Sequence, residues 1–266
     1  MRAIIILVII VIFLFIPIPI HAKESSAIDR LDKLSDEALQ MVKLGRYEDA
    51  KKLLDYFSEQ FLSVSNVERS FTSDELRIVT LSHDEAVQAA ANVAMNHEER
   101  ISRVTKFRLV IDTIASKYKP LWTEMEAPIM STLTEVKEAA DSGDKENFHS
   151  KLNSFLSLYD TIYPSMKLSV EVGRIQQLDT RINYIDRYRP QILTGSDHLQ
   201  ELEALETDLQ LLFDDMGEDE ADPSLWWVII STGSIIILTL SYVGWRKYKG
   251  EKENEKQKGR SRDHKD

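Results

Sequence analysis

The chain has 266 residues, of which 43% are hydrophobic and 29% are charged, and its formal net charge is −11. It contains no cysteine, which excludes a disulfide framework, a thiolate metal site and a cysteine nucleophile. The negative charge lies in the central segment, Lys23 to Trp245, which holds 23 basic and 39 acidic residues. So acidic a surface argues against nucleic acid as a partner, because phosphates would be repelled.

The N-terminal segment, residues 1–22, predicts a secretory signal peptide. Arg2 precedes an unbroken apolar run from Ala3 to Ile16, and Pro17 and Ala22 come next as a helix breaker and a small cleavage-site residue. The same pattern leaves an uncleaved signal anchor open. In either case the segment directs the export of the helical body.

The body, residues 23–213, is predicted to be all-α. In residues 28–45 apolar side chains recur at spacings of three and four, and Gly45 marks the end of that helix. Residues 46–64 repeat the pattern, so the two stretches predict an antiparallel helical hairpin. Its GRYEDA turn and the apolar-faced helix after it resemble a single tetratricopeptide unit, with Tyr47 and Ala50 at interlocking positions.

A related pattern returns 98 residues later, in residues 142–164. This interval is far from the 34-residue period of a tetratricopeptide array. The pattern therefore predicts two similar hairpins and leaves a duplicated body open. The matching positions are Gly45 and Gly143, Glu48 and Glu146, Leu54 and Leu152, and Phe57 and Phe155.

Between the hairpins, Ser82 and Glu85 in LSHDEA predict a capping box that starts a long helix, from Asp84 to Lys117. At about 1.5 Å per residue that helix would extend roughly 50 Å, as a spine of the body. The FTSDELRIVTL stretch just before it is the one place where an extended segment is expected, because residues 78–80 are β-branched.

Prolines delimit the later helices. Pro128 lies in the first turn of one predicted helix, and Pro164 is expected to precede another, which closes before Pro190. The last helix of the body, residues 197–213, has leucines at alternating spacings of three and four, which predicts a packing seam. These leucines are Leu202, Leu205, Leu209 and Leu212.

The C-terminal part predicts a membrane anchor. An acidic link, residues 214–224, precedes 21 uncharged residues from Leu225 to Trp245. As a helix this stretch would extend about 31 Å, close to the ~30 Å hydrocarbon core of a bilayer. The tail, residues 246–266, has nine basic and five acidic residues. Because basic residues favour the cytoplasmic side, we predict a single-pass cell-membrane protein with an extracytoplasmic body and a cytoplasmic tail.

Aromatic and basic residues at both ends of this span are expected to contact the lipid headgroups of the membrane. They are Trp226, Trp227, Tyr242, Trp245, Arg246, Lys247 and Lys249.

No motif for chemistry is found. The histidines are scattered, and the nine glycines form no phosphate loop and no nucleophile elbow. We therefore expect no cofactor, metal site or catalytic residue, and predict that the protein is not an enzyme. Trp122, Tyr118, Tyr159 and Tyr163 could line a groove for a protein partner, although aromatic residues at helical spacing more often belong to a core.

The signal-like start, the GRYEDAKKLLDYFSEQF, LRIVTLSHDEAVQAA and RLVIDTIASKYKPLW stretches and the final span with its basic tail together resemble the YpjB sporulation protein family. The resemblance implies a membrane protein of endospore-forming bacteria connected with spore formation. It transfers no functional residue.

These observations support three hypotheses. The leading one is a membrane-anchored, non-enzymatic sporulation protein that acts through protein–protein contacts of its exported body, with an unidentified partner and an open oligomeric state. The alternative is an extracytoplasmic sensor that binds a ligand or peptide and signals through the span to a cytoplasmic partner. A cell-wall or peptide hydrolase is the third and least favoured.

Overall fold

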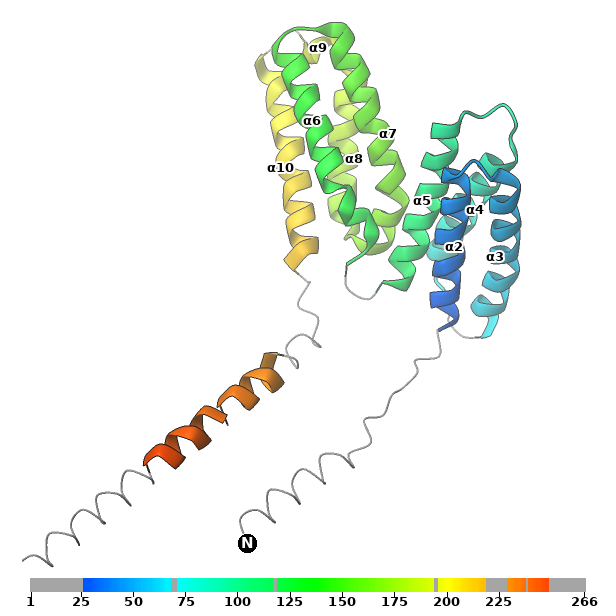
Figure 1. Cartoon of the computed structure of the whole chain (residues 1–266). Helices are drawn as coiled ribbons and strands as arrows, with labels where there is room; N and C mark the ends of the chain where they lie inside the picture. Colours follow the sequence, from blue (N-terminus) through cyan, green and yellow to red (C-terminus); the bar gives the residue numbers. More distant parts are fainter. Residues whose placement is uncertain are drawn as a thin grey trace, which may run out of the picture. The chain divides into compact units, whose positions relative to one another are not determined.

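The structure is a computed structural model that describes residues 26–67, 71–116, 119–193, 196–218, 229–237 and 239–248. Within these ranges every element is a helix and no strand occurs, which confirms the all-α prediction (Figure 1). The helices are α2 Ala27–Lys43, α3 Tyr47–Val67, α4 Ser73–Ala91, α5 His97–Ala115, η1 Leu121–Met125, α6 Glu126–Asp141, α7 Lys145–Ser169, α8 Val172–Arg187, α9 Arg189–Ile192, α10 Ser196–Glu218 and a further helix, Ile229–Tyr248.

The first four helices form a bundle, here called the first bundle. The α2 helix packs on α3, α3 packs on α4, and α4 packs on α5. The α5 helix closes the ring by packing on α2. Side chains from all four helices fill its centre, among them the fully buried Leu54, Phe57 and Val104. The Phe57 ring meets the edge of Phe107 with 4.8 Å between ring centroids, a favourable aromatic geometry. The predicted hairpin of residues 28–64 is thus confirmed as α2 and α3.

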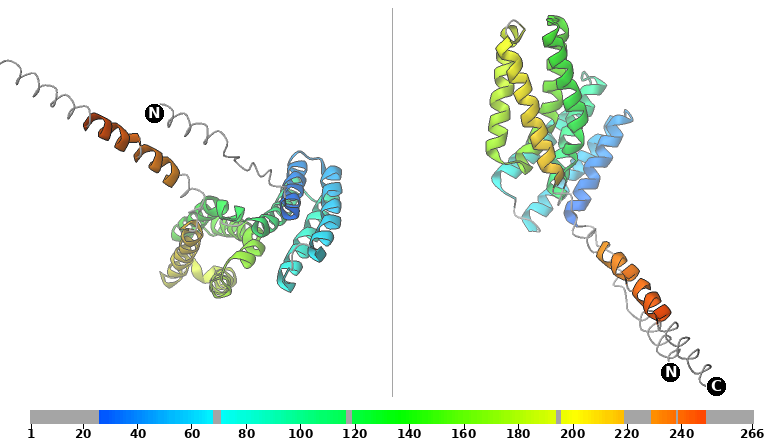
Figure 2. Two further views of the ribbon diagram at one scale, coloured as in Figure 1. Left: turned by 90° about the horizontal axis from the view of Figure 1, so that it is seen from below. Right: turned by 90° about the vertical axis from the view of Figure 1, so that its left-hand side faces the viewer.

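The second bundle consists of α6, α7, α8 and α10 as far as Asp208, and Figure 2 gives two further views of both bundles. The α6 and α7 helices form its hairpin. Ion pairs hold α10 in place. Lys137 of α6 lies 2.5 Å from Glu206, while Arg181 of α8 lies 2.6 Å from Glu201 and 3.0 Å from Asp208.

The hairpin turns of the two bundles are alike. Gly45 and Gly143 have φ angles of +72° and +67°, in the left-handed region that favours glycine. In each turn the glycine amide donates to the carbonyl three residues earlier, at 2.9 Å and 3.1 Å. The next amide donates to the carbonyl five residues earlier, at 2.8 Å and 3.0 Å. Both helices therefore end in the same C-cap, as the 98-residue interval predicts.

The correspondence extends beyond the hairpins, because α8 matches α4 and α10 matches α5. Buried positions of α5 recur 98 residues later in α10, and those of α4 recur 96 residues later in α8. The body is therefore a tandem of two four-helix bundles. Matching buried residues are Val104 and Leu202, Phe107 and Leu205, Val79 and Ile175, Ser82 and Leu178, and Ala86 and Ile182.

The expected extended segment and the long spine are both wrong. Residues 73–91 are helical, because Thr72 and Glu75 form a reciprocal capping box and residues 78 and 79 face the core. Ser82 is no cap, since its hydroxyl donates to the carbonyls of Ile78 and Val79 inside α4. The spine is interrupted after α4, and Asn96 caps the N-terminus of α5.

The expectation for Pro164 is also wrong. Pro164 lies inside α7, which continues to Ser169, and the next helix begins only at Val172. The other expected boundaries hold, since Pro128 lies in the first turn of α6 and α8 ends before Pro190. Packing of the α7 face overrides the local preference of proline for a helix start.

The four leucines of the predicted seam are buried, and α10 continues to Glu218, so the first five residues of the acidic link are helical. Other sequence predictions lie outside the described residues. These are the signal segment, the remainder of the link, Tyr118, Trp226, Trp227 and Lys249.

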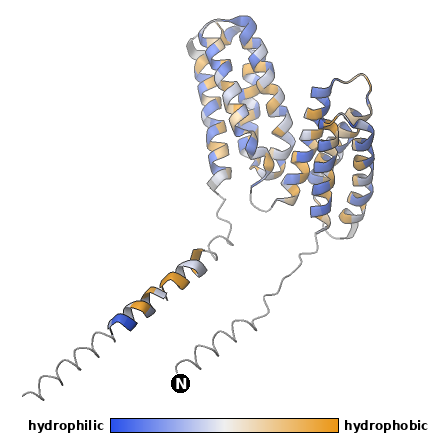
Figure 3. Ribbon diagram, in the orientation of Figure 1, coloured by the Kyte–Doolittle hydropathy of each residue, from blue (hydrophilic) through white to orange (hydrophobic). Residues whose placement is uncertain are grey.

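The helix Ile229–Tyr248 is, in the described ranges, the one helix long and apolar enough to cross a membrane by length and composition. None of its apolar window is buried, and Figure 3 shows the apolar residues along it. This helix is compatible with membrane anchoring.

Candidate partner-binding cleft at the junction of the two bundles

The two bundles meet where α5 lies against α7. Six consecutive residues of α5, 107–112, are buried, so this helix is covered on all sides there. A helix with one solvent face would instead show an apolar stripe. At the contact, the hydroxyl oxygens of Ser102 and Thr161 are 3.2 Å apart, a hydrogen bond between the bundles.

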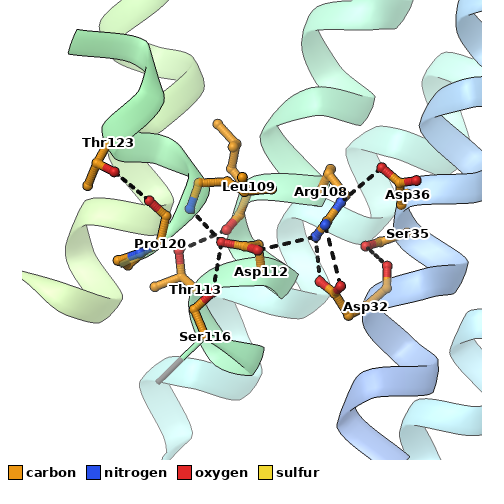
Figure 4. A network of polar contacts seen from close by, with 11 residues as sticks. Asp32, Ser35, Asp36, Arg108, Leu109, Asp112, Thr113, Ser116, Pro120 and Thr123 are labelled. Atoms are coloured by element: carbon orange, nitrogen blue, oxygen red, sulfur yellow. Dashed lines mark hydrogen bonds and ion pairs between the residues drawn. The ribbon is translucent and has the colours of Figure 1, made fainter. Parts of the chain in front are cut away.

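A partly buried polar network links α2 and α5 to the start of η1 (Figure 4). The Arg108 guanidinium pairs with Asp32 of α2 at 2.5 Å and lies 3.5 Å from Asp36 and 3.8 Å from Asp112. Asp112 accepts a hydrogen bond from the backbone amide of Leu121 at 2.6 Å. Arg108 and Asp112 thus connect α2, α5 and the first residue of η1 through polar contacts.

Burial raises the pKa of the Asp112 carboxyl above its ordinary value of 3.8, while the Leu121 amide and the Arg108 charge act in the opposite direction. Its hydrogen bonds serve the connection between α5 and η1. We therefore assign the network to positioning rather than to chemistry.

A cleft of about 200 Å³ opens at the junction, between α4 and α5 of the first bundle and α7 of the second. Its walls combine apolar and charged side chains. Leu81 is 54% exposed at its edge, whereas Ile78 is buried beneath it. The other main lining residues are Arg77, Lys106, Asp160 and Tyr163.

Lys106 is the centre of this cleft. Its side chain is only 12% exposed, and its Nζ lies 3.2 Å from Glu85 and 2.5 Å from Asp160. The lysine thus joins α4, α5 and α7. Two further cations stand at the rim: Arg77, 3.2 Å from Asp74, and Lys167, which makes no ion pair with a described carboxylate.

Two tyrosines of α7 share one carboxylate of α8. The phenols of Tyr159 and Tyr163 donate to the two oxygens of Asp179, at 3.0 Å and 2.7 Å. Burial, followed by the nearby Asp179 carboxylate, raises the pKa of both phenols, that of Tyr163 to about 12. Both therefore stay protonated donors at physiological pH.

The structure separates the aromatic residues that the sequence suggested for a groove. Trp122 is fully buried and donates its indole N–H to Ser169 at 3.0 Å, and Tyr159 is 6% exposed. These two belong to the core, where a partner has no surface to contact. Of the described candidates, Tyr163 lines the cleft. On the apolar helix, Tyr242 and Trp245 are exposed, as are Arg246 and Lys247.

The charged centre of the cleft has no signal in the sequence. Lys106 and Asp160 are 54 residues apart, and both sit among many other charged residues on helix faces. Only the packing of α5 on α7 brings them together. In the described ranges no group of three or more histidine or carboxylate side chains could hold a metal ion.

Comparisons with known proteins agree on one family. The model of the family described as "Sporulation protein YpjB" matches residues 28–257. The chain is 37% identical over 233 residues to the "Uncharacterized protein YpjB" of Bacillus subtilis (strain 168), covering 87% of this chain and 88% of the relative. No solved structure matches the chain at a significant level.

Proposed function

Because the chain belongs to the YpjB family of sporulation proteins, we propose that it is a membrane-anchored, non-enzymatic protein that acts through protein contacts of an exported helical body. The observation that carries the proposal is the apolar helix Ile229–Tyr248, none of whose window is buried. An exposed apolar surface of this length is costly in water and is stabilised in a bilayer.

The flanking charges support an outward body. Six acidic residues lie between Asp214 and Asp222, and the tail after Trp245 is net positive. Basic residues close to a span favour the cytoplasmic side. The body, from residue 23 to the acidic link, then lies outside the membrane.

The junction cleft supports a protein partner over a small ligand. Its volume of about 200 Å³ is below the roughly 300–1,000 Å³ of small-molecule sites, and it suits one large side chain of a partner. Its edge combines the exposed apolar Leu81 with the cations Arg77 and Lys167, while the lining carboxylates Glu85 and Asp160 pair with Lys106. A partner residue that is apolar and flanked by carboxylates fits this chemistry.

The likeness of the α2–α3 hairpin to a tetratricopeptide unit is part of the proposal, since such units bind partners through stacked hairpins.

Topology is tested by labelling, for which the cysteine-free chain is well suited. A single cysteine is introduced either at Ser131, exposed in the body, or at Ser261 in the tail. A membrane-impermeant maleimide applied to intact cells should label the Ser131→Cys chain and spare the Ser261→Cys chain until the cells are lysed. Labelling of the tail alone would reverse the orientation.

Anchoring is tested by deletion of residues 225–266. The body should then leave the membrane fraction after signal cleavage, whereas a chain with an unrelated apolar span in place of residues 225–245 should remain there. If the truncated body persists in the membrane fraction with its signal segment removed, the C-terminal anchor is refuted.

Partner binding at the cleft is tested with a photo-crosslinking amino acid in sporulating cells. At Leu81 it should give a discrete adduct that Lys167→Glu abolishes, whereas at Val93, which is 95% exposed on the α4–α5 turn, it should give none. Equal adducts at both positions would contradict a specific site.

A further inference from the structure

The internal repeat relates two grooves of the body. In the first bundle, the cleft between α4 and α5 is closed on one side by α7. In the second bundle, a wider groove of about 590 Å³ between α8 and α10 is open to solvent. Three α4 residues of the cleft match, 96 residues later, three α8 residues that line the groove. The pairs are Arg77 and Gly173, Leu81 and Gln177, and Glu85 and Arg181.

The α7 helix, which closes the cleft between α4 and α5, also has a counterpart in the first bundle. By the 98-residue interval α7 matches α3, whose buried Leu54 and Phe57 correspond to Leu152 and Phe155. The outer face of α3 carries Leu62, a large apolar side chain that is 60% exposed. Within the described residues, the face of α3 that matches the docking face of α7 is thus exposed and partly apolar.

The contacts between α5 and α7 define the residues that an equivalent pairing of α10 with α3 would bring together. The ion pair of Lys106 with Asp160 becomes Ala204 opposite Leu62, so a salt bridge is replaced by two apolar residues. Both residues of the pair have changed character together.

The second contact behaves in the same way. The hydroxyl pair of Ser102 with Thr161 becomes Gln200 opposite Ser63, so a polar pair remains polar. Gln200 and Ser63 are both exposed. Both of these contacts thus have a complementary counterpart, in residues that are exposed or, at Ala204, half-buried.

We propose that α3 of one copy of the chain docks in the α8–α10 groove of a second copy, which repeats the packing of α7 on α4 and α5. Such a contact joins two different surfaces, so it is heterologous, and a pair of copies still has one unoccupied α3 and one unoccupied α8–α10 groove. It adds copies in a row unless the rotation per copy closes a ring. This contact is independent of the junction cleft and of the orientation in the membrane.

The decisive experiment recreates between copies the ion pair that exists within one. Full-length chain in mild detergent is compared by sedimentation with Leu62→Asp, Ala204→Lys and the double variant. The parent should self-associate, and each single variant should associate at least about tenfold more weakly, because a charge then faces an apolar residue. The double variant should recover association, now weakened by salt because Asp at 62 faces Lys at 204.

A crosslinking arm covers the case in which Ala204→Lys disturbs α10. Leu62→Cys and Ala204→Cys chains, purified separately and mixed, should form a heterodimer with a short bismaleimide. Leu62→Cys mixed with Ser131→Cys, on the exposed side of α6, should not. A parent that sediments as a monomer, a double variant no better than the singles, or equal crosslinking in both mixtures would overturn the proposal. A monomer would mean that the polar surface of α10 caps the tandem instead.

Discussion

Substitution of the two turn glycines by alanine tests both the backbone geometry and the repeat. A Cβ added at Gly45 or Gly143 meets no atom within 4 Å, so the cost comes from the left-handed φ alone. A left-handed residue with a Cβ costs about 1–2 kcal/mol. The lower entropy of alanine in the unfolded chain offsets roughly 0.4–1 kcal/mol of this. We therefore expect each variant to lose about 1 kcal/mol of unfolding free energy.

Gly217 provides the matched control. It lies within α10, its φ is not positive, and its added Cβ also meets nothing, so Gly217→Ala should stabilise by about 0.5–1 kcal/mol. Urea unfolding of the full chain, followed by circular dichroism at the helix band, measures all three. If Gly45→Ala and Gly217→Ala changed the free energy of unfolding in the same direction, the backbone argument would be refuted. A loss at Gly45 without one at Gly143 would contradict the equivalence of the two turns.

Three further predictions concern the junction and α7. Ser169→Ala should lose about 1 kcal/mol of stability to urea because it removes the hydrogen bond from the Trp122 indole, and Trp122→Phe should lose more because it also leaves a cavity in the core. The Tyr163 phenol, whose pKa is raised to about 12, should ionise late in an absorbance titration, and the absorbance change near that pH should shrink by one phenol in Tyr163→Phe, because the Tyr159 phenol ionises later still. Its contribution to stability is present below pH 10 and is lost as the pH rises through about 12. Because the pKa of Asp112 is raised in the folded chain, the stability of the parent relative to Asp112→Asn should fall as the pH rises above 3.8, and a constant difference would contradict the shift.

Local patterns in the sequence predict the helices and the hairpin turns, because these depend on neighbouring residues. Gly45 ends its helix through its own backbone freedom, and the buried leucines of α10 follow the helical period. Where two local signals compete, sequence reasoning fails. Ser82 and Glu85 look like a capping box, yet Thr72 and Glu75 form the real one ten residues earlier.

The candidate site could not be predicted, because it depends on contacts between distant helices. Lys106 becomes a central residue only because α7 brings Asp160 beside it. The aromatic candidates divide for a related reason, since Trp122 and Tyr159 are buried whereas Tyr163 lines the cleft. Burial decides whether an aromatic residue belongs to a core or to a groove, and the helical spacing of Trp122 and Tyr159 fits both.

The burial of α5 on all sides has a consequence for cooperativity. A helix that belongs to two bundles at once cannot lose one neighbour without exposing residues such as Leu109 and Val110. A fragment that ends before α7 would present this apolar surface to water and to other chains. The two bundles should therefore unfold in a single transition, and a nascent chain should reach its stable state only after α7 has been synthesised.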